Sequence, residues 1–218
     1  VKSYNVEVNY WYDYIYGALQ PGYPTSVQWG VKYAGYDESG MLQIEGADGS
    51  KKSILLAEKE DVQALGQTLP KYDLSWTNRF KFGNVDFSFM FVSKLGHILA
   101  EDYFSGKNVW NRHVADSQTY KPDSMYPTIS FNNYYGSYLG YTDAVYKSAN
   151  FLRLREVNLG YNFSSSFLKK IGFESARAYI QGRNLLTVTA KGVSIDPELK
   201  YTSYKTPKEI NLGLQFTF

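Results

Sequence analysis

The histidines, the acidic residues and the arginines are the side chains that could support catalysis or metal binding. The sequence has two histidines, His97 and His113, and no cysteine. The two histidines lie far apart and lack the spacing of a metal-binding pair, so we expect surface histidines, no metal and no cofactor. A thiolate nucleophile is excluded, and nothing in the sequence places a serine beside a histidine. We therefore expect no enzyme.

Two further polar groups have ordinary structural explanations. Asp48-Gly49 lies among polar residues and predicts a turn rather than a calcium loop. Arg153 and Arg155 come just before a predicted strand. We expect solvated charge at a strand end, and the alternative is that the two arginines bind an anionic ligand.

The stretch from Ser93 to Asn150 mixes tyrosine, phenylalanine and tryptophan with asparagine and aspartate. Aromatic faces stack on sugar rings or peptide side chains, and amides bond to hydroxyls or backbone groups. If this stretch binds a substrate, the first candidates are Trp110, Asn132, Asn133, Tyr134 and Tyr135. The alternative is that these side chains pack the loop against itself.

The composition limits the class of protein. The 218 residues carry 23 basic and 21 acidic side chains, a net charge of +2, so we expect no nucleic-acid partner. No run approaches the roughly 18 apolar residues of a membrane-spanning helix. Yet the chain holds 21 Tyr, 13 Phe and 4 Trp, and its mean hydropathy is negative. The arrangement of these aromatic residues therefore needs an explanation.

Apolar and polar residues alternate with a period of two, which predicts strands. Gly83-Asn84 separates two such segments and predicts a tight hairpin turn. The side chains of one segment, 176–189, cannot be assigned to faces, because Tyr179 and Ile180 are neighbours. The strands are expected at 4–16, 72–82, 85–91, 156–163, 176–189 and 210–218.

The connections between these strands alternate between short and long, which is typical of an up-and-down barrel in an outer membrane. We therefore expect an all-β fold, a transmembrane antiparallel barrel portion of about six strands, with apolar faces toward lipid and polar faces toward a wet lumen. The alternative is a soluble β-sandwich, in which the same apolar faces are buried between two sheets.

The last strand ends with a polar residue, a glycine and two aromatic residues at fixed spacing. This pattern resembles the C-terminal signal that the outer-membrane barrel assembly machinery reads by strand addition. The residues are Asn211, Gly213, Phe216 and Phe218. The alternative is an ordinary amphipathic strand.

Several ordered motifs run along the whole chain. They are Gly22-Tyr-Pro24, Tyr33-Ala-Gly-Tyr-Asp37, Leu69-Pro-Lys-Tyr72, Asn150–Phe163 (NFLRLREVNLGYNF), Tyr179–Leu186 (YIQGRNLL) and Asp196-Pro-Glu198. Their order is similar to that in SusC/RagA-type TonB-dependent outer-membrane transporters. The resemblance implies that residues 1–218 form the C-terminal portion of a 22-stranded barrel whose plug domain is absent from this chain.

The chain departs from the family pattern at two places. Arg183 stands where the family usually has glutamine. Only Gln20 and Pro21 separate the first predicted strand from the Gly22 motif, whereas the family has a further strand pair there. We therefore predict that a strand pair is missing near residues 19–22. No signal peptide precedes Val1, and we expect the chain to be a portion of something longer.

The resemblance implies localisation in the outer membrane of a Gram-negative, Bacteroidota-like cell. The implied function is active import of a bulky nutrient, an oligosaccharide or a peptide. The implied partners are a SusD-like surface lipoprotein, TonB acting through the absent N-terminal part, the barrel assembly machinery and lipid. The lipoprotein offers a second alternative for the aromatic loop, which could pack against it. Rival functions are a soluble carbohydrate-binding module and a porin or adhesin barrel independent of TonB.

Overall fold

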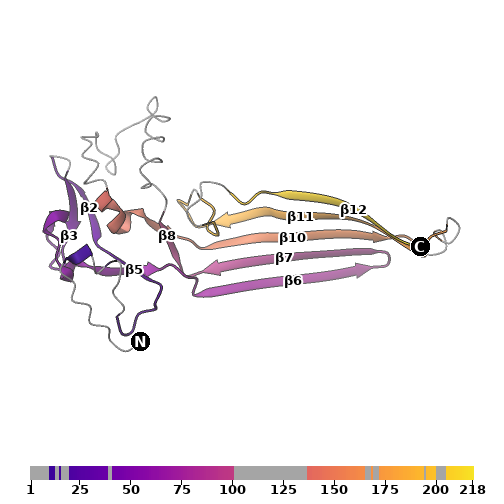
Figure 1. Ribbon diagram of the computed structural model, residues 1–218, viewed down its shortest axis with the longest axis horizontal. Helices are drawn as coiled ribbons and strands as arrows, with labels where there is room; N and C mark the ends of the chain where they lie inside the picture. The colour runs from indigo at the N-terminus through magenta and orange to yellow at the C-terminus, as the bar shows by residue number, and fades with distance from the viewer. Residues whose placement is uncertain are drawn as a thin grey trace, which may run out of the picture. The chain divides into compact units, whose positions relative to one another are not determined.

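The computed structural model describes residues 10–12, 15, 20–38, 41–100, 137–164, 168, 172–193, 195–199 and 205–218 (Figure 1). The chain divides into two compact units, Val1–Leu69 with His97–Ser148, and Pro70–Gly96 with Ala149–Phe218. Among the described residues, no helix is both long and apolar enough to cross a membrane.

The second unit is a single antiparallel sheet of five strands in the order β12-β11-β10-β7-β6 (Figure 1). Strands β6 (Tyr72–Phe82) and β7 (Val85–Leu95) form the predicted hairpin. Gly83 in its turn has a φ of 57°, a left-handed conformation that favours glycine. The other strands are β10 (Phe151–Asn162), β11 (Ser175–Thr189) and β12 (Glu209–Thr217). These five long strands confirm the sequence prediction of an antiparallel barrel portion.

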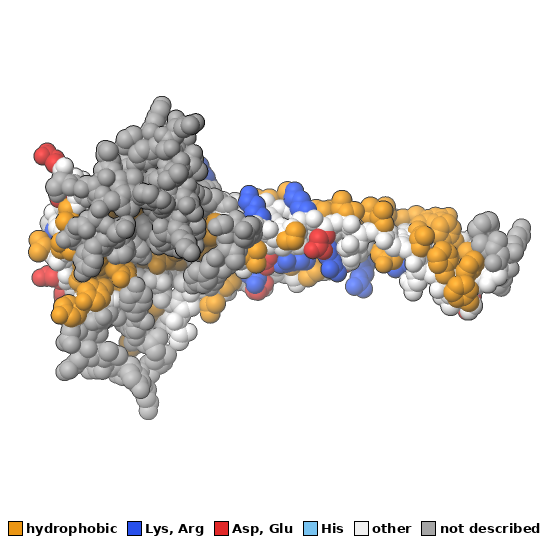
Figure 2. Space-filling model, turned by 45° about the horizontal axis from the view of Figure 1, so that its top comes forward, with side chains coloured by type: hydrophobic (Ala, Val, Ile, Leu, Met, Phe, Trp, Pro, Cys, Tyr) orange, Lys and Arg blue, Asp and Glu red, His pale blue; other side chains and the backbone are white. Residues whose placement is uncertain are grey.

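The register places most of the large apolar side chains of the five strands on one face, because residues directly opposite each other point to the same side. The exceptions include Met90, Val92, Phe151 and Tyr179. Across the sheet, Phe80 pairs with Phe87, Phe87 with Leu159, Leu159 with Ile180 and Ile180 with Leu212. The other face carries charged and amide side chains. Figure 2 shows both kinds of side chain, with hydrophobic groups gathered toward the end of the sheet where β12 finishes.

A bulge in β10 explains why two consecutive polar residues, Arg155 and Glu156, interrupt its alternation. The pairing of β10 with both neighbours shifts between Leu154 and Glu156. The extra residue at a bulge shifts the alternation by one position, so the side chains after the bulge again point to their expected faces. Leu154 and Val157 can therefore both lie on the apolar face. The same register resolves the facing of β11, where Tyr179 lies on the polar face and Ile180 on the apolar face.

The first unit is a lobe of short strands around its own core. Its strands are β1 (Val27–Gly30), β2 (Lys32–Tyr36), β3 (Leu42–Glu45), β4 (Lys51–Ser53), β5 (Gln63–Gln67), β8 (Ile98–Ala100) and β9 (Tyr146–Ser148). Short 3₁₀ turns η1 (Ile54–Leu56), η2 (Lys59–Asp61), η3 (Ser137–Tyr141) and η4 (Asp143–Val145) complete it. The buried core is Val31, Leu42, Ile44, Ile54, Leu139 and Val145.

The sequence predicted long connections here and did not predict the short strands that these connections contain. Strands of three to five residues are too short to show a clear period of two. The Asp48-Gly49 turn is confirmed, because the Gly49 amide donates to the Gly46 carbonyl at 2.8 Å and the Ser50 amide donates to Asp48 at 2.9 Å.

The first predicted strand, 4–16, is wrong at its described residues. Trp11, Tyr12 and Ile15 have helical backbone. Ile15 is buried and Trp11 packs against the core of the lobe, so tertiary packing overrides the alternating pattern there. Leu19 lies outside the described residues, and the missing strand pair near residues 19–22 stays a prediction.

Candidate functional site

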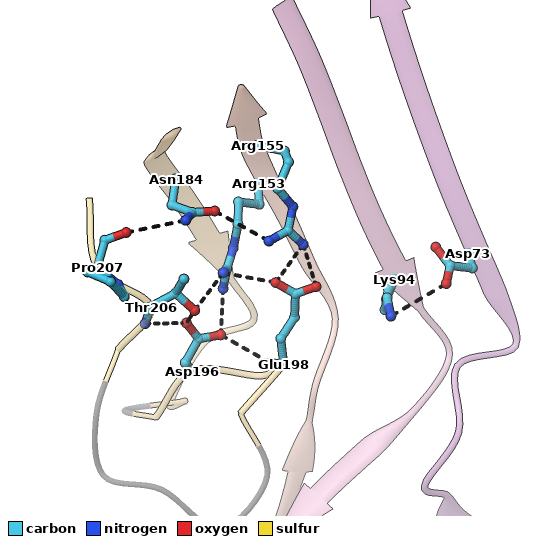
Figure 3. A network of polar contacts seen from close by, with 9 residues as sticks. All are labelled: Asp73, Lys94, Arg153, Arg155, Asn184, Asp196, Glu198, Thr206 and Pro207. Carbon is cyan, nitrogen blue, oxygen red and sulfur yellow. Dashed lines mark hydrogen bonds and ion pairs between the residues drawn. The ribbon is translucent and has the colours of Figure 1, made fainter. Parts of the chain in front are cut away.

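The polar face of the sheet carries a network that ties the segment after β11 to strand β10 (Figure 3). Arg153 of β10 is fully buried, with 0% of its side chain exposed. Its guanidinium donates to Asp196 at 2.5 Å and to Thr206 at 2.8 Å, and it pairs with Glu198 at 2.9 Å. Its Cζ atom also lies 5.5 Å from the ring centre of Phe151. The buried charge is thus compensated by two carboxylates and one ring face.

Arg155, the extra residue of the bulge, extends this network. Its Nη2 atom donates to both carboxylate oxygens of Glu198, at 2.6 and 2.8 Å. Both contacts are charge-assisted, and one guanidinium nitrogen bridges the two carboxylate oxygens. Nη1 of Arg155 donates to Asn184 at 3.3 Å, and Asn184 in turn donates to the Pro207 carbonyl at 3.3 Å. Two arginines therefore hold both ends of the segment between β11 and β12.

Opposing effects set the pKa of Asp196. Burial by itself raises the pKa of this carboxyl, because the charged form loses hydration. Hydrogen bonds from the Thr206 side chain and backbone, the Glu198 backbone and Arg153 outweigh burial and hold the pKa of Asp196 below its ordinary value. Asp196 is thus ionised and available to pair with Arg153 at neutral pH.

These contacts correct two sequence expectations. Arg153 and Arg155 lie within β10 and are paired with carboxylates of the same chain. They are therefore neither solvated charges at a strand end nor open sites for an anionic ligand. The expected surface position of His97 is also wrong, because only 5% of this residue is exposed.

A second ion pair joins the two strands that lie on either side of β10. Asp86 of β7 and Arg177 of β11 form a salt bridge, and Asn162 of β10 donates to Asp86 at 3.0 Å. Gly160 lies opposite Asp86 in the register, and Arg177 lies opposite Asn162, two residues further along β10. A Cβ atom at Gly160 would lie 2.5 Å from Arg177 Nη2 and 2.6 Å from Asp86 Oδ2. The absence of a side chain at position 160 therefore makes room for the pair.

The structure separates the predicted assembly residues between the two faces of β12. Asn211 and Gly213 lie on the polar face, and the Tyr179 ring covers Gly213 so closely that a Cβ there would lie 2.1 Å from Tyr179 Cζ. Phe216 and Phe218 pack against Phe173, with ring centres 5.2 and 5.0 Å apart. This arrangement is compatible with an assembly signal, which stays a prediction.

The predicted substrate-binding residues cannot be placed, because Trp110, Asn132, Asn133, Tyr134 and Tyr135 lie outside the described residues. His113 lies outside them too. In the part of the chain that the structure describes, no group of three or more His, Cys, Asp or Glu side chains could hold a metal ion.

Sequence reasoning missed both ion-pair systems. The residues of the Arg153 network had been noted in two separate motifs, and only the fold brings Asp196 and Glu198 to β10. The pair of Asp86 and Arg177 had one usable signal, which was a glycine inside a strand at position 160. Such a glycine indicates that other groups approach the backbone closely.

Comparisons with known proteins agree with the resemblance seen in the sequence. No family model matches. TonB-dependent receptor P3 of Formosa agariphila is 25% identical over 170 residues, covering 72% of this chain and 16% of the receptor. TonB-dependent receptor P26 of the same organism is 27% identical over 222 residues, covering 87% of this chain and 22% of the receptor. The chain thus spans about a fifth of the length of these curated relatives.

Solved structures show the same fold. The RagAB peptide importer in its open-open state matches 92% of this chain and 24% of the solved chain, with a TM-score of 0.66 and 17% identity. A RagAB peptide transporter structure matches 90% of this chain and 23% of the solved chain, with a TM-score of 0.66 and 21% identity. The predicted resemblance to SusC/RagA-type TonB-dependent transporters is confirmed, and the relatives are named as receptors and transporters rather than enzymes.

Replacing Asp196 with asparagine should destabilise the sheet and release the segment after β11. The change leaves Arg153 buried with one charge partner fewer, at a cost of about 3–5 kcal/mol. Asp73→Asn is the matched control, because Asp73 pairs with Lys94 at 3.5 Å while 66% of its side chain is exposed, and such pairs contribute at most about 1 kcal/mol. Thermal unfolding of the full-length protein and proteolysis at residues 190–208 measure the effect. Equal behaviour of the two variants would contradict this account.

The stabilising effect of Asp196 should disappear only in acid. Its folded pKa lies below the ordinary value, so its contribution is complete above the unfolded pKa of about 3.9 and is lost as the pH falls through the folded value. The difference in melting temperature between the wild type and Asp196→Asn should therefore be constant from pH 7 to about pH 5 and shrink below about pH 4. A difference that shrinks already between pH 7 and 5 is the opposing result.

Gly160→Ala should destabilise the sheet by about 1–3 kcal/mol, because the new methyl group forces Asp86 and Arg177 apart. Gly140→Ala is the control, since no heavy atom of a described residue outside its own turn lies within 4 Å of a Cβ at that position. Melting temperatures of both variants, and of Gly160→Ala combined with Arg177→Gln, measure the effect. If Gly160→Ala costs as much without Arg177 as with it, the ion pair is not the reason for the glycine.

Proposed function

We propose that this chain, which resembles part of a SusC/RagA-type TonB-dependent transporter, forms barrel wall and surface loops of an outer-membrane importer. The importer takes up a bulky nutrient, an oligosaccharide or a peptide. It acts with a SusD-like surface lipoprotein and with TonB, and the barrel assembly machinery inserts it. In this proposal, the 218 residues supply the C-terminal portion of the barrel.

The observation that supports this proposal most strongly is the exposed apolar face of the sheet. Leu212 is 79% exposed, Phe82 is 70% exposed and Ile210 is 69% exposed. The large apolar residues of this face are Tyr72, Leu74, Trp76, Phe80, Phe82, Val85, Phe87, Phe89, Phe91, Leu95, Leu152, Leu154, Val157, Leu159, Tyr161, Ile180, Leu186, Val188, Ile210, Leu212, Leu214 and Phe216. A lipid environment accounts for all of them together.

The free-energy cost of exposing this face to water is the main reason to infer that the face contacts lipid. Burying one large apolar side chain stabilises by about 1.5–3 kcal/mol. Exposing this whole face would thus cost on the order of tens of kcal/mol, more than the roughly 5–15 kcal/mol that stabilises a typical folded protein. A soluble β-sandwich would cover the face with a second sheet. The described residues of this unit form one sheet only, which favours the barrel.

The names of the similar proteins support the proposed transport activity and partner. Curated relatives are named TonB-dependent receptors, and the solved neighbours are described as a RagAB peptide importer or transporter. The second component of that assembly supports a surface lipoprotein as the partner here. These names, together with the apolar face of the sheet, also support an outer-membrane location.

A charge placed on the apolar face should block membrane assembly, whereas the same charge on the polar face should be tolerated. Val157→Lys introduces an ammonium group near the middle of the wall, which costs about 2–4 kcal/mol in lipid. Thr77→Lys is the matched control, because threonine has the shape of valine and Thr77 lies on the polar face, opposite Met90, which pairs with Glu156.

Each lysine substitution is introduced into the full-length protein. The folded fraction in the outer membrane is measured from the difference in gel mobility between heated and unheated samples. We expect a several-fold loss for Val157→Lys and little change for Thr77→Lys. Equal recovery of both variants, or recovery of wild-type protein in the soluble fraction, would overturn the proposal.

A further inference from the structure

The polar face of the sheet contains a hollow of about 530 Å³. Its charged lining residues are Arg79 of β6, Asp86 of β7 and Arg177 of β11, and amide side chains of Asn158, Gln181 and Gln215 complete its polar surface. Five neighbouring strands contribute to it, so the sheet itself holds these groups in place.

The charges in the hollow are not balanced. Asp86 is the only carboxylate among the lining residues, and it forms its salt bridge with Arg177. The Arg79 side chain forms no ion pair or hydrogen bond with any described residue; Ser88 stands opposite it in the register. The lining therefore carries two guanidinium groups and one carboxylate, and the charge of Arg79 is left without a partner.

Amide side chains from the other strands of the hollow supply further hydrogen-bonding groups. Asn158 donates to Ser88 at 3.2 Å and to Glu156 at 2.6 Å, which fixes its orientation. Gln181 and Gln215 make no side-chain hydrogen bonds to the described residues. A hollow that holds a guanidinium and two such amides on different strands suits a ligand that combines a carboxylate with other polar groups.

We infer that this hollow binds a carboxylate group of the imported molecule and that Arg79 is the residue that recognises it. This inference rests on the proposed function, in which the polar face lines the path through the barrel. The carboxylate belongs either to an acidic side chain of a peptide or to a uronic acid of an oligosaccharide. In both cases Arg79 donates a charge-assisted hydrogen bond that a neutral analogue cannot accept with equal strength.

The test compares acidic and neutral probes on the full-length transporter purified in detergent. The peptide pair is acetyl-pentaglutamate amide and its glutamine counterpart, and the sugar pair is pentagalacturonate and galactopentaose. Titration calorimetry gives the dissociation constants. In one of the pairs, we expect the acidic probe to bind about tenfold more tightly than its neutral counterpart. The pair that shows this preference identifies the source of the carboxylate.

Two variants assign the preference to Arg79. Arg79→Gln should remove it, so that acidic and neutral probes bind alike. Lys81→Gln is the matched control, because Lys81 lies two residues further along the same face of β6 and outside the hollow; this variant should keep the preference. Absence of a preference in both pairs, or its persistence in Arg79→Gln, would overturn the inference.

A separate measurement distinguishes this failure from failure of the proposed function. Cells that express the same proteins are tested for folded insertion in the outer membrane and for loss of uptake when TonB is deleted. A protein that inserts and transports without any preference for carboxylates refutes the role of Arg79 alone. A protein that does not insert refutes the proposed function itself.

Discussion

The two-sided sheet is the constraint on which the rest of this structure depends. In a bilayer, every backbone polar group must be hydrogen-bonded within the protein, and only side chains can meet the hydrocarbon. Antiparallel pairing on both sides satisfies the first requirement for the three inner strands β7, β10 and β11, apart from the bulge in β10. The alternation of side chains meets the second, since the register places most of the leucines, valines and phenylalanines on one face and the charged residues on the other.

The polar face has its own requirement, which is that charges near the sheet must be compensated. Arg153 is fully buried and shares two carboxylates, Asp196 and Glu198, with Arg155. Arg177 and Asp86 compensate each other across Gly160. These contacts give a physical explanation for two of the sequence motifs, because the arginines of β10 and the Asp-Pro-Glu segment form one network. Arg79, which lines the hollow, makes no such contact with a described residue.

The sequence predicted the long strands well and the short ones poorly, for physical reasons. β6, β7 and β12 are amphipathic over their whole length, so a period of two identifies them directly. The lobe around Val31, Leu42 and Ile44 is built from strands of three to five residues, in which no period can be recognised. Trp11 and Tyr12 followed the alternating pattern but have helical backbone, because contacts with distant residues such as Tyr138 and Tyr141 are invisible to local reasoning. Pairs such as Asp86 with Arg177 likewise depend on register across three strands.

Spin labels on adjacent residues of β6 test most directly which face of the sheet meets lipid. Trp76→Cys and Thr77→Cys, each labelled in an otherwise cysteine-free full-length protein in bilayers, place nitroxides on opposite faces of one strand. We predict that the label at position 76 collides more with oxygen, which dissolves in lipid, and that the label at 77 collides more with a water-soluble nickel chelate. A label at 76 that the nickel chelate reaches as readily as the label at 77, or that neither reagent reaches, would contradict a lipid-facing wall.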